Sequence, residues 1–203
     1  TLAERGYFPK EDLKTLRHTG SYLQGHPDMK HIPGVDMSSG SLGQGISAAV
    51  GMAIAGKLSN ADYRVYTLLG DGEIQEGQVW EASMLAAHKK LDNLVVIVDN
   101  NNLQIDGAID EVNSPYPIDK KFEAFNFHVI NIDGNDFDQI DAAFKEAKTV
   151  KGQPTAIVAK TLKGKGVSYM ENQAGWHGKA PNDEEYKIAM DDLEKAGEAI
   201  CQM

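Results

Sequence analysis

Cysteine is nearly absent from this sequence of 203 residues, and long apolar runs are absent altogether. Cys201 has no second cysteine with which to form an internal disulfide, so nothing indicates a disulfide-stabilised secreted fold. No apolar run approaches the roughly 20 residues that a membrane-spanning helix needs, and no signal-peptide pattern opens the chain. We therefore expect a cytoplasmic protein that has no membrane partner.

Positive charge is also scarce. There are 20 Lys and Arg residues against 30 Asp and Glu residues, which gives a formal net charge of −10. Nucleic-acid binding depends on an excess of basic residues, so this balance argues against a nucleic-acid partner. It leaves anionic substrates open, because a local pocket can be positive on an acidic protein. The length and the hydrophobic content of 41% suit one globular domain.

Short apolar segments alternate with segments of helical spacing along the chain. Strands are expected at 63–69, 94–98, 127–132 and 155–159, and helices at 11–18, 46–57, 76–89, 137–150 and from about 183 onward. Between the first two helices, the Gly-, Pro- and Ser-rich stretch 20–45 is expected to be a long functional loop. This alternation predicts an α/β fold with a parallel sheet and helices on both faces. Such sheets bind ligands at the carboxyl ends of their strands.

Two polar clusters follow two of the expected strands. Gly-Asp-Gly at 70–72 ends one strand, and an Asp-Asn-Asn-Asn run at 99–102 ends the next. We expect Asp71 and Asn101 to meet at the sheet edge, where their oxygens and the Leu103 carbonyl would suit Mg²⁺ and leave places for a diphosphate. Glycine lets the backbone approach phosphates, and the following helix offers N–H groups. Each motif alone favours a simple turn or loop, whereas the pair at this spacing favours a metal and diphosphate site.

Longer motifs resemble the transketolase family. They are GHPD at 25–28, GSLGQG at 40–45, GDGEIQEGQVWEA at 70–82, KLDNLVVIVDNN at 90–101, AKTLKGKG at 159–166 and WHGKAP at 176–181. The chain is most similar to the short bacterial type, in which the two halves of the enzyme are separate chains. The resemblance implies a thiamine diphosphate-binding fold of the diphosphate (PP) type over residues 1–203. It also implies that the upstream part of this domain and the pyrimidine-binding domain are missing.

The resemblance implies binding roles for individual residues. Asp71, Asn101 and the Leu103 carbonyl are expected to bind Mg²⁺. The residues expected to bind thiamine diphosphate are Gly40, Ser41, Leu42, Gly70, Asp71, Gly72, Asn101, Ile105, Lys163 and His177. Among them, the Gly72 N–H would donate to the diphosphate, and Lys163 and His177 would lie near it. The segment 40–42 would contact the aminopyrimidine side, and Ile105 would pack against the rings.

His26, His177 and Glu76 are the residues expected to take part in catalysis. By the same resemblance, His26 would face the hydroxyls of the donor sugar, and Glu76 would occupy a buried acidic position near a subunit contact. Structural interpretations stay open for each. The two histidines could only stabilise loops, and Glu76 could serve only the helix dipole.

Structural interpretations also apply to other basic residues. Lys163 and Lys165 could belong to a solvated turn, since LKGKG does not match the phosphate-loop pattern GxxxxGK[ST]. The remaining histidines match no functional motif and are expected to be structural; they are His18, His31, His88 and His128.

The implied reaction is the transfer of a two-carbon ketol unit from a ketose phosphate to an aldose phosphate. Thiamine diphosphate would supply the carbanion chemistry. A pyrimidine-binding half, in a second subunit, would supply the glutamate that activates the cofactor, and we expect a hetero-oligomer with two copies of each half. Two alternatives stay open. One is a deoxyxylulose-phosphate synthase, which does not normally have GHPD or GSLGQG in this form, and the other is a non-catalytic cofactor-binding subunit.

Overall fold

The computed structural model describes residues 1–201. Within that range, four parallel strands form one sheet in the order β1-β2-β6-β5. The strands are β1 (Val65–Gly70), β2 (Leu94–Asn100), β5 (His128–Asp133) and β6 (Thr155–Lys160). The register pairs Gly70 with Asp99 and Asn100 with Lys160. The carboxyl ends of β1, β2 and β6 therefore lie along one edge of the sheet, as the sequence predicts.

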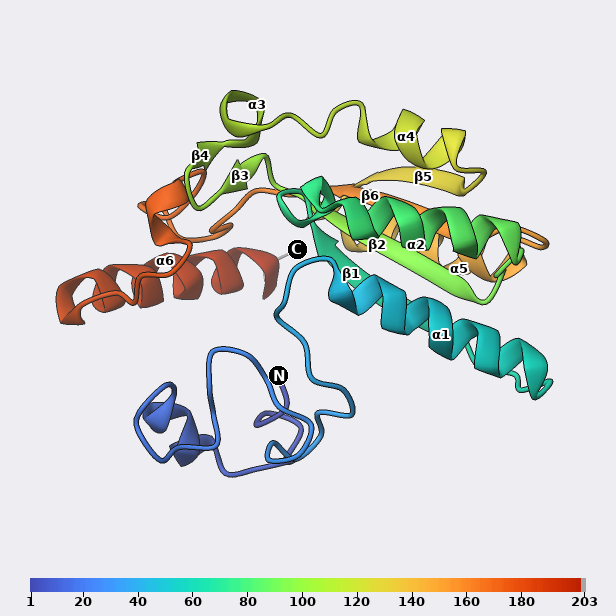
Figure 1. The fold of residues 1–203 in the computed structure, drawn as a ribbon. Coiled ribbons are helices and arrows are strands. Elements are labelled where there is room, and N and C mark those ends of the chain that lie inside the picture. The colour runs from blue at the N-terminus through green and yellow to red at the C-terminus, as the bar shows by residue number, and fades with distance from the viewer. Residues whose placement is uncertain (202–203) are drawn as a thin grey trace.

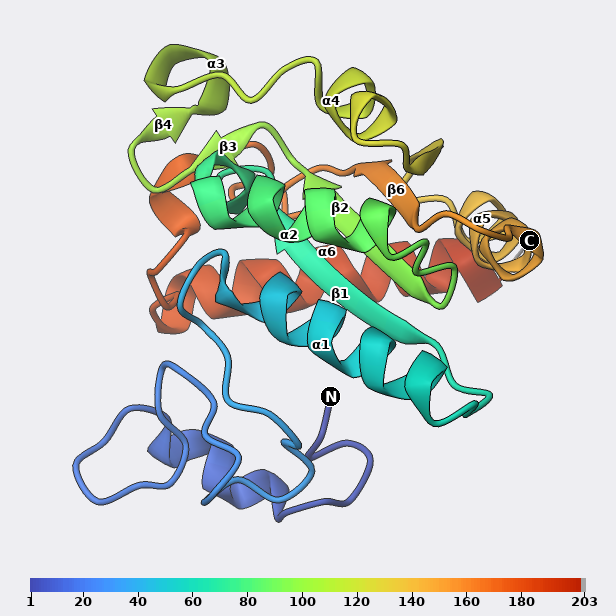
Figure 2. The same ribbon diagram turned by 45° about the vertical axis from the view of Figure 1, so that its right-hand side comes forward.

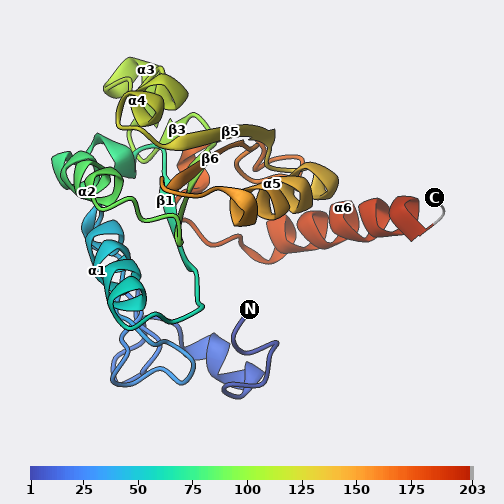
Figure 3. The same cartoon turned by 90° about the vertical axis from the view of Figure 1, so that its right-hand side faces the viewer.

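Helices cover both faces of this sheet, which confirms the expected fold class (Figures 1 and 3). Along one face lie α1 (Gln44–Leu58), α2 (Gly77–His88) and α4 (Ile118–Ala124), and along the other lies α5 (Phe137–Thr149). The larger core fills the first layer, where the fully buried Phe122 packs against Trp80 and Phe127. The smaller core joins α5 to the sheet through Ala143 and Ile157. Because β2 is buried from both sides, its sequence is a continuous apolar run.

The segment 1–43 lies apart from the sheet and is mostly loop (Figure 1). The helix expected at 11–18 is instead a short 3-10 helix, η1 (Lys10–Thr15), and none of its residues is buried. Leu13 and Leu16, which suggested a helix face, are both about half exposed. A short helix without a buried face gains too little from packing to extend.

The segment after β2, to which the sequence assigned no element, makes a turn over the sheet edge. It forms the hairpin β3 (Leu103–Gln104) and β4 (Gly107–Ala108), then α3 (Ile109–Val112), and leads into α4. This hairpin places Ile105 at its tip. At the other end of the chain, α6 (Asp183–Cys201) runs on the side of β1 away from α1 and α2 (Figure 2). No helix within residues 1–201 is long and apolar enough to cross a membrane.

Candidate functional site

The carboxylate of Asp71 is held at the point where β1 and β2 end. Its backbone N–H donates to the carbonyl of Asp99 (3.1 Å), which continues the pairing of the two strands. Its Oδ1 accepts from the N–H of Gly72 (2.9 Å), and its Oδ2 accepts from the N–H of Asn102 (2.6 Å). Burial raises the pKa of Asp71 above its ordinary value, and the two N–H groups only partly oppose this rise. A buried acidic group of this kind gains stability as a carboxylate when a cation binds beside it.

Asn101 lies beside Asp71 and is fixed by its own bonds. Its side-chain oxygen accepts from the N–H of Leu103 (3.0 Å), and its Nδ2 donates to a carboxylate oxygen of Asp99 (3.2 Å). The other oxygen of Asp99 accepts a bond from the hydroxyl of Thr161, the first residue after β6. Three neighbouring strands thus end in one network of hydrogen bonds, which restricts the directions in which Asn101 and Asp99 point.

A cavity of about 440 Å³ opens above this network. It brings together ten of the residues that the sequence predicts for the site: Leu42, Gly70, Asp71, Gly72, Glu76, Asn101, Leu103, Ile105, Lys163 and His177. Leu42 and Ile105 are 58% and 71% exposed, so the cavity has apolar side chains at its rim, together with the exposed Glu76 and Asp106, and the buried carboxylate of Asp71 at its floor. Such an amphipathic cavity can accept a ligand that is charged at one end and apolar at the other.

Two of the three remaining predicted residues line a separate hollow of about 330 Å³. They are His26 and Ser41, and the residue after Ser41, Leu42, lines the main cavity. Gly40 packs directly on the ring of His26: a Cβ added to Gly40 would lie 2.7 Å from the ring carbon Cγ. The structure thus separates His26 from the acidic cavity while keeping the two spaces next to each other in the fold.

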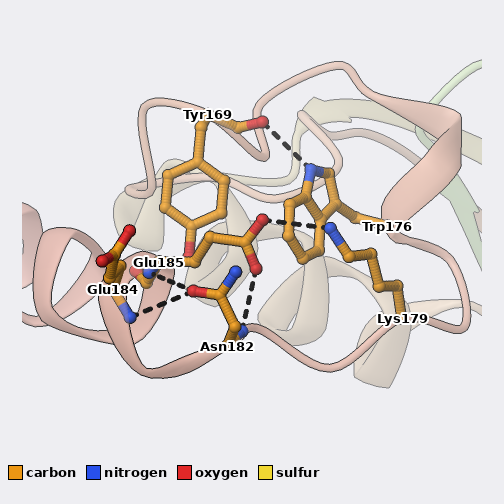
Figure 4. Close-up of polar contacts among 6 residues, drawn as sticks. All are labelled: Tyr169, Trp176, Lys179, Asn182, Glu184 and Glu185. Carbon is orange, nitrogen blue, oxygen red and sulfur yellow. Dashed lines mark hydrogen bonds and ion pairs between the residues drawn. The ribbon is translucent and has the colours of Figure 1, made fainter.

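The loop that carries His177 is fixed by a cluster of polar and aromatic contacts (Figure 4). The indole N–H of Trp176 donates to the carbonyl of Tyr169 (3.1 Å), and the ammonium of Lys179 lies 4.1 Å from the Trp176 ring centroid. The Glu185 carboxylate then bonds Lys179 (3.0 Å) and the N–H of Asn182 (2.8 Å). Both sides of His177 are therefore tied to the start of α6, which holds this residue at the cavity wall.

Known proteins are similar to this chain in sequence. The family model for the thiamine diphosphate-binding domain of transketolase matches residues 5–195. The chain belongs to this family. It is 45% identical over 196 residues to a 6-deoxy-6-sulfo-D-fructose transketolase subunit of Clostridium sp. (strain MSTE9), covering 97% of this chain and 71% of that protein. It is 42% identical over 192 residues to an apulose-4-phosphate transketolase subunit of Actinobacillus succinogenes, covering 95% and 69%.

Solved transketolases contain the same fold. The crystal structure of transketolase from Campylobacter jejuni matches with a TM-score of 0.85 and 37% sequence identity, covering 91% of this chain. The chain spans 30% of the length of that transketolase. The transketolase of Mus musculus is 47% identical over 181 residues, which are 87% of this chain and 28% of the mouse protein. The expected α/β thiamine diphosphate-binding fold is thereby confirmed.

The roles expected of Glu76 and Gly72 stay predictions. Glu76, expected at a buried position near a subunit contact, is exposed in the single chain and directly precedes α2 at the cavity rim. The Gly72 N–H, expected to donate to a diphosphate, donates to Asp71 here. The helix expected at 76–89 is confirmed as α2 (Gly77–His88), and a short 3-10 helix, η2 (Glu73–Gln75), precedes it.

Several residues of the cavity wall are not predicted from the sequence. Among them are Glu73, Gln75, Asp99 and Gln104. The side-chain amide of Gln75 donates to the side-chain oxygen of Gln104 (2.7 Å) and to the carbonyl of Asn113 (2.7 Å), which ties the β3–β4 hairpin to η2. Their positions close to Gly72 and Asn102 are the only sequence signal that could have identified them.

Gly43 allows a test of the backbone that joins the two hollows. Gly43 has φ of 78° in the left-handed region, and an added Cβ would lie 2.9 Å from the Cβ of Glu76. We expect Gly43→Ala to lower the free energy of unfolding by about 1–2 kcal/mol, because a left-handed conformation disfavours a side chain. Urea denaturation of the purified chain measures this difference.

Gly45→Ala is the matched control. It lies two residues later, inside the first turn of α1, where an added Cβ meets nothing within 4 Å. Replacing a helical glycine by alanine should leave the stability unchanged or raise it by up to about 1 kcal/mol. Equal losses in the two variants would contradict the assignment of strain to Gly43.

Proposed function

We propose that this chain is the diphosphate-binding half of a transketolase that transfers a two-carbon ketol unit between sugar phosphates. The observation that supports this most strongly is the meeting of Asp71, Asn101 and Leu103 in one cavity at the carboxyl edge of the sheet. The match to the transketolase family favours this reaction over that of a deoxyxylulose-phosphate synthase. Mg²⁺ and thiamine diphosphate are the cofactors of the proposal.

The donors at the strand ends fit Mg²⁺. Asp71 supplies a buried carboxylate, and each of its oxygens has accepted only one hydrogen bond from the protein. Asn101 can add an amide oxygen, and Leu103 can add its carbonyl. Within residues 1–201, no group of three or more His, Cys, Asp or Glu side chains is placed to hold a metal. A mixed set with few carboxylates suits Mg²⁺, which usually keeps places for water and phosphate oxygens.

The charge of the cavity explains why metal and diphosphate would bind together. Five carboxylates line it, and the basic residues among the lining residues are Lys163 and His177. The carboxylates are those of Asp71, Glu73, Glu76, Asp99 and Asp106. A bare diphosphate would be repelled by this lining. We infer that Mg²⁺ neutralises the floor, and that Lys163 and His177 then pair with the outer phosphate oxygens.

The residues of the chain would position the substrates, and thiamine diphosphate, when bound, would supply the nucleophilic carbon that accepts the ketol unit. The apolar Leu42 and Ile105 would exclude water from the rings at the rim. His26, in the adjoining hollow, would bond the hydroxyls of the donor sugar and exchange protons with them. His177, which lines the acidic cavity, would stay with the cofactor.

The proposal includes a partner subunit that binds the pyrimidine end of the cofactor. Two relatives that match nearly the whole chain are named as transketolase subunits. We propose that this chain likewise works with a pyrimidine-binding subunit that encloses the exposed rim around Leu42 and Ile105, in a hetero-oligomer with two copies of each half. That subunit would supply the glutamate that activates the aminopyrimidine.

The activity of the assembled enzyme tests this function. The chain alone should not transfer a ketol unit from xylulose 5-phosphate to ribose 5-phosphate, even with thiamine diphosphate and Mg²⁺. Adding a pyrimidine-binding transketolase half should produce turnover. Robust turnover by the single chain would contradict the need for a partner. A pair that assembles without turnover would favour the non-catalytic alternative.

Asp71→Ala tests the metal. In the assembled enzyme, this change should abolish Mg²⁺-dependent binding of thiamine diphosphate, because the buried carboxylate is the principal charge offered to the cation. Calorimetry with and without Mg²⁺ measures the binding, and circular dichroism checks the fold. Asp110→Ala removes an exposed carboxylate that does not line the cavity and should leave binding unchanged. Cofactor affinity unchanged by the loss of Asp71 would refute the metal assignment.

The two histidines should differ in what they affect. His26→Ala should raise KM or lower kcat for ketose donors with little change in cofactor affinity, since His26 lies outside the acidic cavity. His177→Ala should weaken cofactor retention as well. Loss of a hydrogen bond used in the transition state would cost about 2–4 kcal/mol. Steady-state kinetics and cofactor titration of both variants measure this, and wild-type behaviour in both would leave the histidines structural.

A further inference from the structure

One side chain, that of Glu73, bridges two backbone segments that are far apart in the sequence. Its Oε1 accepts from the N–H of Gly43 (2.9 Å), and its Oε2 accepts from the N–H of Gly70 (3.1 Å). Gly43 directly precedes α1, whereas Gly70 is the last residue of β1. One carboxylate therefore sets the distance between the loop before α1 and the end of the first strand.

The Gly70 N–H needs such an acceptor because of its place in the sheet. β1 is the edge strand, and only β2 pairs with it. The next residue, Asp71, donates its N–H toward β2. Since successive N–H groups along a strand point to opposite sides, that of Gly70 points to the open edge, where no strand accepts from it. Glu73 provides the acceptor there.

Gly43 needs an acceptor for a different reason. It stands in the left-handed conformation immediately before α1, so its N–H belongs to the turn that ends the 40–43 loop and not to the helix. Gly43 is buried, and a buried N–H without a partner costs about 1–3 kcal/mol. A carboxylate is a strong acceptor for such a group.

We propose that Glu73 is a positioning residue, which locks the loop 40–42 to the turn 70–72. This inference rests on the proposed function, in which that loop meets the aminopyrimidine side of the cofactor and that turn meets the diphosphate and Mg²⁺. The protein must bind both ends of the cofactor in one conformation, so the separation of the two segments must be fixed. Glu73 touches neither end in this role and acts only through the backbone of Gly43 and Gly70.

A positioning role for Glu73 and a purely electrostatic role predict opposite effects of a substitution on cofactor affinity, which makes the inference testable. Glu73 lines an acidic cavity, so removing its charge should strengthen the binding of an anion if charge were all that mattered. Glu73→Gln keeps the shape but replaces one acceptor oxygen with an N–H₂ group, which cannot accept from a backbone N–H. Positioning therefore predicts weaker binding, and charge alone predicts stronger binding.

The experiment combines cofactor binding with amide exchange. In the enzyme assembled with its partner, calorimetry at saturating Mg²⁺ should show the Kd for thiamine diphosphate rising about tenfold in Glu73→Gln, as expected for the loss of one charged hydrogen bond. Glu73→Asp, which keeps the charge but is one methylene shorter, should show a similar rise. In the chain without cofactor, hydrogen exchange at the Gly43 amide, the Gly70 amide or both should become at least about tenfold faster in each variant.

Asp136→Asn is the matched control. Asp136 also accepts from two backbone N–H groups, those of Asp138 and Gln139, but it begins α5 and does not line the cavity. This variant should leave the Kd unchanged, which separates positioning from a general loss of stability. A Kd for Glu73→Gln that is unchanged or lower, or unchanged exchange at Gly43 and Gly70, would overturn the inference. If the wild-type enzyme binds no thiamine diphosphate, the proposed function fails, and the exchange data still decide whether Glu73 joins the two segments.

Discussion

The structure of the site depends on one buried carboxylate, that of Asp71. An ionised carboxyl group removed from water costs several kcal/mol unless other groups compensate it. Here two backbone N–H groups, from Gly72 and Asn102, each bond one oxygen. The Asn102 bond has a wider effect, because it fixes the segment after β2 against the segment after β1. The β3–β4 hairpin and the position of Asn101 follow from that contact.

The two N–H groups offset only part of the cost of burying the Asp71 carboxylate, and this makes Asp71 suitable for binding a cation. If the N–H groups compensated burial fully, the pKa of Asp71 would not be raised, yet burial outweighs them and the nearby charge of Asp99 adds to the rise. A divalent cation would remove both penalties and hold the group in its charged form. The same excess of negative charge disfavours a diphosphate without a metal. In the proposed function, burial of this one side chain would thus explain why the diphosphate needs the metal in order to bind.

The sequence predicts those features that depend on side chains in a local pattern. The strand at β2 is visible because burial on both faces requires an unbroken apolar run, and Asp71 and Asn101 are visible because each directly follows a strand. The β3–β4 hairpin cannot be predicted, since strands of two residues leave no alternation of polar and apolar residues to detect. The role of Glu73 cannot be predicted for a different reason. Its partners are backbone N–H groups, which any residue at positions 43 and 70 other than proline would offer, so no pairing of side chains records the contact.

The polarity of the cavity also favours one orientation for the proposed cofactor. Its buried carboxylate, that of Asp71, lies at the sheet edge where β1 ends, whereas its exposed apolar side chains, Leu42 and Ile105, belong to two loops at the rim. A reversed ligand would place its rings against the buried carboxylate and its phosphates against leucine and isoleucine, so neither end would be compensated. With the diphosphate at the edge, the rings would lie at the rim beside Leu42, and the preceding residue, Ser41, lines the hollow that contains His26. In the proposed function, this division of polar and apolar surface would therefore place the reacting end of the cofactor near the proposed donor-sugar site.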